Sequence, residues 1–183
     1  QDIIFSGPED TLKQTQYTQP AIYIVSVIIG ELLMENGIQP SCAAGHSLGE
    51  YSALALAKAF DFETGLRLVK IRAEGMQISG NQHPGTMAAV LGLDDDQIIN
   101  ICENFSGGTV VAANFNAAGQ VVISGETDAV QNVMHILKEA GALKVVELNV
   151  SGAFHSPLMK PARDFLAKAL ESTIINHSVI PVY

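Results

Sequence analysis

The chain has 183 residues, of which 48% are hydrophobic and 16% are charged, so it can form a substantial core and does not have the composition of a disordered protein. Its net charge of −9, without any run of Lys or Arg, argues against binding to nucleic acid or to an anionic membrane surface. The two cysteines, Cys42 and Cys102, form no CxxC pair, which is typical of reduced thiols in a cytoplasmic protein.

The first predicted element is an apolar helix that begins at Thr18-Gln19-Pro20, where a hydroxyl cap precedes a proline that the first turn tolerates. The run from Ala21 to Met34 is apolar except for three residues, and Asn36-Gly37 closes it with a glycine cap. A membrane span needs about 20 apolar residues. The run is shorter and interrupted, so it predicts a helix that is buried on most faces, in a protein without a membrane segment.

A short strand is predicted next, over Ile38–Ala44, and it leads directly into the sequence GHSLGE at positions 45–50. Leu48–Phe60 is rich in Ala and Leu and predicts a helix. A second helix restarts at Asp61, because apolar side chains then recur every three or four residues on one face. These side chains are Phe62, Leu66, Val69, Ala73 and Met76. The polar stretch 79–84, which contains Gly and Pro, predicts a turn.

The pattern changes after residue 84. Strands are predicted over Thr86–Leu91, Thr109–Phe115, Gln120–Ser124 and Lys144–Val150. Helices are predicted from Asp94-Asp95-Asp96 to about Phe105, and over Glu126–Ala140. The resulting order β-α-β-β-α-β is typical of a ferredoxin-like unit.

The remaining residues return to a different pattern, with a loop over Ser151–Pro157, a helix from Pro161 to about Ser172 and a strand over Val179–Tyr183. We therefore predict an α/β protein built from two subdomains. Residues 84–150 would form a small ferredoxin-like subdomain, inserted between two parts, 1–83 and 151–183, of a hydrolase-like large subdomain.

GHSLGE contains the GxSxG pattern of a nucleophile elbow, in which a serine lies on a strained turn between a strand and a helix. Ser47 would be the nucleophile, and the backbone N–H of Leu48 would point at the oxyanion that develops on a substrate. The glycines on either side are expected to avoid the clash that a Cβ would cause in so sharp a turn. The pattern is short enough to arise by chance, so a purely structural glycine turn remains the alternative.

A serine nucleophile needs a base, and the candidates are five histidines. His155 is favoured because it lies in the loop sequence GAFHSPLM, and loops often carry catalytic groups. His46 is next to Ser47, but its side chain is expected to point away. The histidines show no metal-ligand spacing, so no metal site is predicted.

Arg72 is a third candidate, because it flanks the buried face of its predicted helix. The position suits an arginine whose aliphatic stem lies along the core. Geometry alone favours this first reading, and the alternative is a guanidinium that binds a carboxylate or a phosphate.

Six stretches of the sequence together resemble the malonyl-CoA:acyl carrier protein transacylases of fatty-acid synthesis and the related acyltransferase domains of polyketide synthases. They follow the family's order across nearly the whole chain. They are TQYTQPA (15–21), AGHSLGEYSAL (44–54), IRAEGMQ (71–77), GTMAAVLG (85–92), NFNAAGQVVISG (114–125) and VSGAFHSPLM (150–159).

The resemblance implies a catalytic pair formed by Ser47 and His155. Ser47 would take a malonyl group from coenzyme A and pass it to the phosphopantetheine thiol of acyl carrier protein, with His155 as base and then as acid. Arg72 would bind the free malonyl carboxylate. No cofactor would be bound, since the coenzyme A thioester is the donor substrate.

The resemblance also places residues around the acyl pocket. Met76 would line the pocket, and Asn114 and Asn116 match a motif near the cleft. In polyketide relatives, a phenylalanine before the histidine accompanies malonyl specificity, and Phe154 matches it. Leu48, directly after the serine, also suits the malonyl type. A bulky ring leaves less room for a methyl branch, a discrimination of about 1–3 kcal/mol.

The sequence departs from the family at both ends. It contains neither the glycine-rich segment whose glutamine N–H completes the oxyanion hole, nor the later segment whose carbonyl orients the histidine. Loss of one oxyanion donor costs about 10²–10³ in rate. We therefore expect the 183-residue chain alone to have weak or no activity, and a longer parent protein to be fully active.

Three functions are weighed: an acyltransferase of a fatty-acid or polyketide pathway, a serine esterase or thioesterase, and a non-catalytic piece of a larger synthase. The esterase would have no use for Arg72. For the acyltransferase we expect a cytoplasmic monomer whose partners are malonyl-CoA and acyl carrier protein. Carrier proteins are acidic, so docking would need a local basic patch. The candidates are Lys58, Arg67, Lys70 and Lys160.

Overall fold

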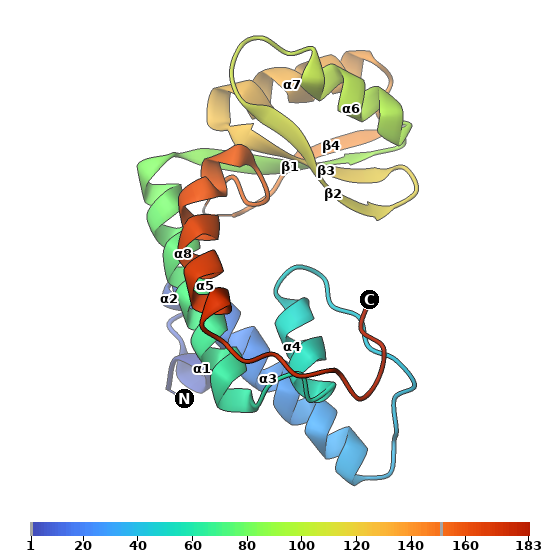
Figure 1. Cartoon of the computed structure of the whole chain (residues 1–183). Helices are drawn as coiled ribbons and strands as arrows, with labels where there is room; N and C mark the ends of the chain where they lie inside the picture. Colours follow the sequence, from blue (N-terminus) through green and yellow to red (C-terminus); the bar gives the residue numbers. More distant parts are fainter. Residues whose placement is uncertain (1, 151) are drawn as a thin grey trace. The chain divides into compact units, whose positions relative to one another are not determined.

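The structure is a computed structural model that describes residues 2–150 and 152–183. They separate into two compact units (Figure 1). The helical unit comprises the residues up to Gly75 together with Arg163–Tyr183, and the sheet unit comprises Met76–Ala162. Two helices continue across a boundary between the units: α5, over Phe62–Gln82, and α8, over Lys160–Glu171.

The helical unit is built from helices that share one apolar core. Besides its parts of α5 and α8, it contains α1 (Asp2–Ser6), α2 (Glu9–Leu12), α3 (Thr15–Glu35) and α4 (Gly49–Leu56). Most core side chains come from α3, α4, α5 and the residues that flank α4, and Leu166 and Leu170 of α8 pack against them. The buried members include Tyr23, Val27, Tyr51, Ala55, Leu68 and Val69.

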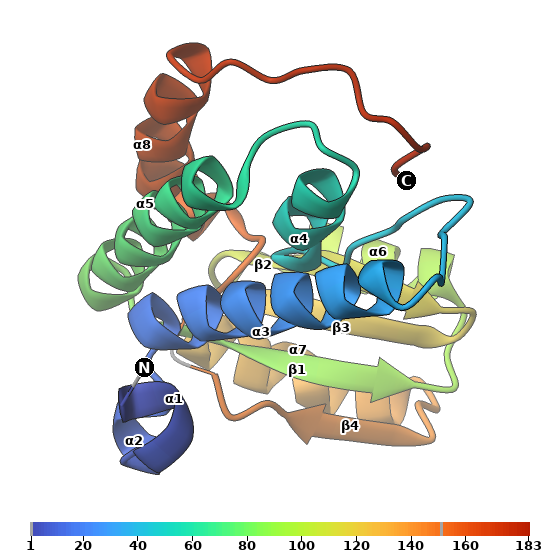
Figure 2. The ribbon, with the colours of Figure 1, turned by 90° about the horizontal axis from the view of Figure 1, so that it is seen from below.

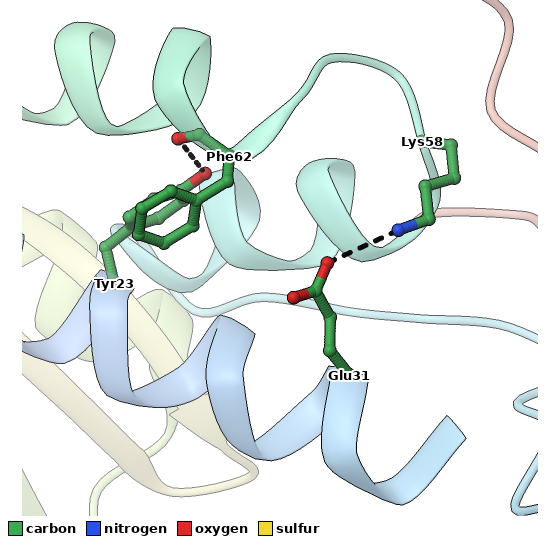
Figure 3. A network of polar contacts seen from close by, with 4 residues as sticks. All are labelled: Tyr23, Glu31, Lys58 and Phe62. Atoms are coloured by element: carbon green, nitrogen blue, oxygen red, sulfur yellow. Dashed lines mark hydrogen bonds and ion pairs between the residues drawn. The ribbon is translucent and has the colours of Figure 1, made fainter. Parts of the chain in front are cut away.

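Helix α3 is joined to its neighbours by close contacts and by polar bonds (Figure 3). The hydroxyl of Tyr23 donates to the carbonyl of Phe62 at 3.1 Å, and the two rings stack with their centroids 5.5 Å apart. A Cβ at Gly65 would lie 2.1 Å from the Tyr23 hydroxyl, so this approach requires glycine. Further along α3, Glu31 pairs with Lys58 at 3.4 Å.

The sequence-based description of α3 was wrong in three respects. The helix begins at Thr15, so Pro20 lies inside it. It starts early because Thr15 and Gln19 face the interior and hydrogen-bond to each other. Its buried residues form one stripe, Thr15, Gln19, Tyr23 and Val27, rather than most faces. Third, the helix is not too short for a membrane span, because its 21 residues are long and apolar enough to cross one by length and composition alone.

The two strands predicted for this unit are reduced to a single parallel bridge between Ala43 and Val182. The N–H of Ala43 donates to Pro181 at 2.9 Å, and its carbonyl accepts from Tyr183 at 3.0 Å. The predicted strands over 38–44 and 179–183 were therefore wrong in extent. A strand is stabilised by a ladder of partners, and each segment pairs with the other at one position.

The sheet unit contains the predicted order of strands and helices. Its elements are β1 (Gly85–Leu91), α6 (Asp95–Glu103), β2 (Val110–Ala117), β3 (Gln120–Glu126), α7 (Thr127–Glu139), β4 (Lys144–Glu147) and a 3₁₀ turn, η1 (Pro157–Met159). The strands form an antiparallel sheet in the order β2-β3-β1-β4 (Figure 2). In the central pair, Gly85 lies opposite Glu126 and Leu91 opposite Gln120.

Helices α6 and α7 cover one face of this sheet (Figure 1). Alternate residues of β1 and β3 point into the core beneath them, as the period of two predicts. Helix α7 contributes an apolar stripe at helical spacing, Ala129, Val130, Val133 and Leu137. The side chain of Asp94 caps α6 by accepting from the N–H of Asp96 at 3.0 Å.

Three local predictions for this unit need revision. Helix α5 continues to Gln82 through the predicted turn, because Ser79 is fully buried and its hydroxyl accepts from the N–H of Ala162 at 3.1 Å. Strand β4 ends at Glu147 instead of Val150, since its pairing with β1 ends there. The loop predicted over Ser151–Pro157 begins at a residue that lies outside the described residues, and its end forms η1.

Candidate active site

Ser47 has a left-handed backbone conformation, with φ of 55°, two residues before helix α4 begins. A residue other than glycine rarely adopts this conformation, and such strain is common at functional sites. A Cβ at Gly45 would lie 2.0 Å from the backbone of Gly49, so the first glycine of the motif is required, as predicted. A Cβ at Gly49 would meet no described atom within 4 Å, so the prediction was wrong for the second glycine.

Leu48 links this turn to the core. It occupies the N-cap of α4, and its side chain is buried among the apolar residues of the helical unit. The turn is closed by bonds from Gly49 N–H to the His46 carbonyl and from Glu50 N–H to the Ser47 carbonyl, at 3.0 and 3.3 Å. Within residues 2–150 and 152–183, the Leu48 N–H donates to no backbone carbonyl. It is therefore available to a ligand at Ser47.

Arg72 of α5 reaches Ser47 across the helical unit. Its Nη2 donates to the Ser47 hydroxyl at 2.8 Å, and its Nη1 donates to the side-chain carbonyl of Gln19 from α3. The guanidinium also lies over the ring of Tyr51 from α4, 6.0 Å from the ring centroid. Three elements therefore hold the guanidinium beside the serine.

The Arg72 guanidinium is half-buried and keeps its charge. Burial lowers its pKa from the ordinary value, while Tyr51 and Glu50 act in the opposite direction. Arginine nevertheless stays protonated in proteins. In the described part of the chain, no carboxylate lies within 4.0 Å of Arg72. The site thus presents a cation with further N–H donors next to a hydroxyl, which suits a substrate that carries a carboxylate.

His155 belongs to the sheet unit, in a short loop that also has a left-handed residue, since its φ is 60°. The loop is fixed by Ser156, whose hydroxyl donates to the Ala153 carbonyl at 2.6 Å and accepts from the Leu158 N–H at 3.3 Å. The His155 side chain is exposed. The loop that carries His155 is therefore fixed by its own hydrogen bonds.

The other predicted pocket residues also belong to the sheet unit. Phe154 packs against Met76, together with Met159 and Ala162. Asn114 and Asn116 lie near the end of β2, half-buried and exposed respectively. Ser47, Leu48 and Arg72 lie together in the helical unit, so the pairing of Ser47 with His155 stays a prediction. Across the described ranges, no cluster of His, Cys, Asp and Glu could hold a metal ion.

Two residues of the site were missed by the sequence analysis, Gln19 and Tyr51. Gln19 carried a signal, because a glutamine inside an apolar helix must find a partner if it is buried. Tyr51 is the third residue of α4, close in sequence to the elbow, and that closeness was its signal. Neither signal identifies Arg72 as the partner, since that contact joins segments distant in sequence.

Comparisons with known proteins agree with this geometry. The acyl transferase domain family matches residues 1–183. The chain belongs to this family. It is 43% identical, over 183 residues, to the malonyl CoA-acyl carrier protein transacylase of Haemophilus influenzae, covering 98% of this chain and 59% of that protein.

Solved structures are similar as well. The malonyl CoA-acyl carrier protein transacylase of Coxiella burnetii superposes with a TM-score of 0.94 at 39% identity, over 99% of this chain and 58% of that one. A malonyl-transacylase solved in complex with a type II polyketide acyl-carrier protein gives 0.93 at 42% identity, over 99% and 59%. The chain thus spans somewhat more than half the length of the proteins that it matches.

Proposed function

We propose that the protein carrying this chain transfers a malonyl group from coenzyme A to the phosphopantetheine thiol of acyl carrier protein. The observation that supports this most directly is the contact between the Arg72 guanidinium and the Ser47 hydroxyl. A cation at this place can bind the free carboxylate of a malonyl group while the thioester carbonyl lies at the serine. The names of the relatives support the same substrates.

In the proposed reaction, Ser47 Oγ attacks the thioester carbonyl and His155 takes the hydroxyl proton. The carbon–sulfur bond then breaks, and the coenzyme A thiolate leaves with the proton from His155. The Leu48 N–H stabilises the oxyanion in between. In the second half, the carrier-protein thiol gives its proton to His155 and attacks the malonyl ester, and Ser47 leaves and regains a proton. No bound cofactor or metal takes part in this scheme.

The remaining roles are proposed on the same basis. Residues 84–150 would be a ferredoxin-like small subdomain, inserted into a hydrolase-like large subdomain formed by 1–83 and 151–183. Met76 and Phe154, which pack together, would line the acyl pocket, and Asn114 and Asn116 would lie near it. We propose a cytoplasmic, monomeric enzyme of fatty-acid biosynthesis. The alternative is a polyketide pathway, and preference between carrier proteins of the two pathways distinguishes them.

Replacement of Arg72 separates this proposal from a serine esterase. Arg72→Ala removes charge-assisted hydrogen bonds, worth about 1.5–3 kcal/mol each. It should therefore lower the preference for malonyl-CoA over acetyl-CoA by about 10- to 100-fold. Arg67→Ala, on the exposed side of the same helix, is the matched control and should keep the preference. An unchanged preference in Arg72→Ala would favour an esterase.

Carrier-protein docking is expected to use exposed basic side chains. Arg67 and Lys70 lie three residues apart on α5 and are both exposed, although Lys70 pairs with Glu74 at 3.9 Å. Lys58 pairs with Glu31. Charge reversal at these three residues and at Lys160, one at a time, should weaken carrier-protein binding in at least one variant. Unchanged affinity in all four would exclude this docking mode.

A further inference from the structure

Behind Arg72 lies a second hydrogen bond that no part of the proposed reaction uses. The side-chain N–H of Gln19 donates to the hydroxyl of Thr15 at 2.9 Å, while the Gln19 carbonyl accepts from Arg72. Thr15 and Gln19 are one helical turn apart on α3 and are 7% and 6% exposed. The bonds form a chain that runs from Thr15 through Gln19 and Arg72 to Ser47, buried at Thr15 and Gln19 and part-buried at Arg72 and Ser47.

We propose that Thr15 is a positioning residue for Arg72 and that it acts through the side-chain amide of Gln19. This inference rests on the proposed function, because it concerns how the carboxylate-binding guanidinium is aimed. Thr15 sets the place of the Gln19 amide, and the amide carbonyl sets the place of the guanidinium. The malonyl carboxylate then meets a cation whose orientation is fixed before the substrate arrives.

The side-chain types suit these roles, with Thr15 as the anchor and Gln19 as the link to Arg72. Glutamine is long and has several rotatable bonds, so holding it in one rotamer costs conformational entropy. Threonine is β-branched and stiff, so its hydroxyl is a well-placed anchor for the amide. The guanidinium carries donors only, and it therefore requires the carbonyl end of the amide. The amide N–H is left to face Thr15, which is the arrangement found.

A neutral partner also leaves the positive charge of Arg72 without a competing negative charge. A carboxylate at position 19 would hold the guanidinium equally well, but it would form an ion pair and compete with the substrate carboxylate. In the described ranges, Arg72 has no carboxylate within 4.0 Å, and Gln19 gives it an oxygen acceptor without a negative charge. The chain from Thr15 thus aims the cation and leaves its charge for the substrate.

Substitutions that keep the side-chain shape can show whether Thr15 orients Arg72 or only fills space in the core. Thr15→Val keeps the volume and removes the hydroxyl, and Thr15→Ser keeps the hydroxyl and tests rescue. Gln19→Glu keeps the shape and adds a negative charge. Gln16→Glu is the matched control, because the Gln16 side chain donates to Gln14 at the exposed start of α3. For each variant of the full protein, the rates of malonyl- and acetyl-enzyme formation are measured by intact mass, and folding is checked by thermal unfolding.

We expect Thr15→Val to lower the malonyl-over-acetyl rate ratio by about threefold to tenfold, the effect of one hydrogen bond. Thr15→Ser should return the ratio to within about twofold of the wild type. Gln19→Glu should lower it by about 30-fold or more, through a raised KM for malonyl-CoA, and Gln16→Glu should leave it unchanged. A simple packing defect would instead slow both donors equally, and the serine variant would not restore the ratio.

An unchanged ratio in Thr15→Val, or equal losses for both donors, overturns the proposal. If Thr15→Val does not fold, Thr15→Ala replaces it with the same expectation and the same contrary result. If the wild type forms no malonyl-enzyme, the proposed function fails instead. Calorimetric binding of free malonate, with acetate as control, then tests the positioning alone. The positioning role predicts a threefold to tenfold weaker malonate affinity in the Thr15 variant, and an unchanged affinity refutes that role.

Discussion

The sheet unit and the helical unit differ in how completely they bury their apolar side chains. In the sheet unit, α6 and α7 close over the sheet, and residues such as Ile123, Val133 and Leu137 are fully buried. In the helical unit, α3 buries one stripe and leaves Ile22, Ile29 and other large apolar side chains about half-exposed. The sheet unit is therefore held by its own core. The helical unit is held mainly by the contacts among α3, α4 and α5.

The sharpest way to break the helical unit is at the first glycine of the elbow. Gly45→Ala forces a Cβ to within 2.0 Å of backbone, which neither side can avoid without shifting the turn. We expect a loss of more than about 3 kcal/mol in unfolding free energy, or a displaced Ser47 that no longer accepts an acyl group. Urea unfolding and acyl-enzyme formation measure the two outcomes.

Gly49→Ala is the matched control within the same motif, because its Cβ would meet no described atom within 4 Å. Alanine is also the better residue for the start of α4. Its unfolding free energy should stay within about 0.5 kcal/mol of the wild type. Equal effects at the two glycines would contradict the geometry described for the elbow.

We expect the next largest loss of stability from a truncation in the core of the sheet unit. Leu137→Ala removes a side chain that is 0% exposed and leaves a cavity beneath α7, which should cost about 2–5 kcal/mol of unfolding free energy. Leu143→Ala, at a leucine that is 85% exposed in the same unit, should cost less than about 0.5 kcal/mol. Denaturant midpoints give both values, and similar losses would mean that the sheet unit lacks the closed core described above.

Alkaline pH should reveal the buried tyrosine that anchors α3. Burial, with smaller contributions from Asp61 and Glu31, raises the pKa of Tyr23 to about 12, compared with 10.0 ordinarily. The stability that comes from keeping Tyr23 neutral is fully present below pH 10 and is lost as the pH rises through 12. The loss should approach about 2–3 kcal/mol. The difference in unfolding free energy between wild type and Tyr23→Phe should therefore change across this range, and a constant difference would contradict the assignment.

The smallest predicted effect is a gain in stability at the end of α4. Lys58 is left-handed, with φ of 61°, and closes a pair of C-terminal bonds in which its N–H donates to Ala55 and that of Ala59 donates to Leu54. Glycine adopts this conformation without strain, so Lys58→Gly should stabilise the protein by about 0.5–1 kcal/mol. The exposed pair with Glu31 contributes too little to reverse the sign. A destabilised variant would contradict this expectation.

The sheet unit was also the part that sequence reasoning described best. Its strands and helices follow local periodicity, and Asp94 caps α6 where the run of aspartates indicated a helix start. Two strands that the sequence predicted for the helical unit are reduced to a single bridge in the structure. A strand depends on pairing partners, and a local pattern does not contain that information. Likewise, apolar composition alone cannot say which face of α3 is covered.

At the site, the GxSxG pattern predicted Ser47 as the nucleophile, and both the helix position and the family resemblance pointed to Arg72. The structure brings these two side chains together, and their roles stay a prediction. The parts that could not be predicted depend on contacts between distant segments. Gln19 is separated from Arg72 by most of α3 and all of α4, so no local pattern joins them. The strained turn at Ser47 was expected from the GxSxG pattern, whereas the left-handed backbone at His155 was not predicted.

The measurement that tests the account most directly is intact-protein mass spectrometry after brief incubation with malonyl-CoA, beside a Ser47→Ala control. We predict a malonyl adduct on the protein that is absent from the control, which would establish both the nucleophile and the donor. The test should be made on this chain and on a protein of the length of its relatives. A folded long protein that gains no adduct, or an adduct that persists in Ser47→Ala, would contradict the proposed role of Ser47.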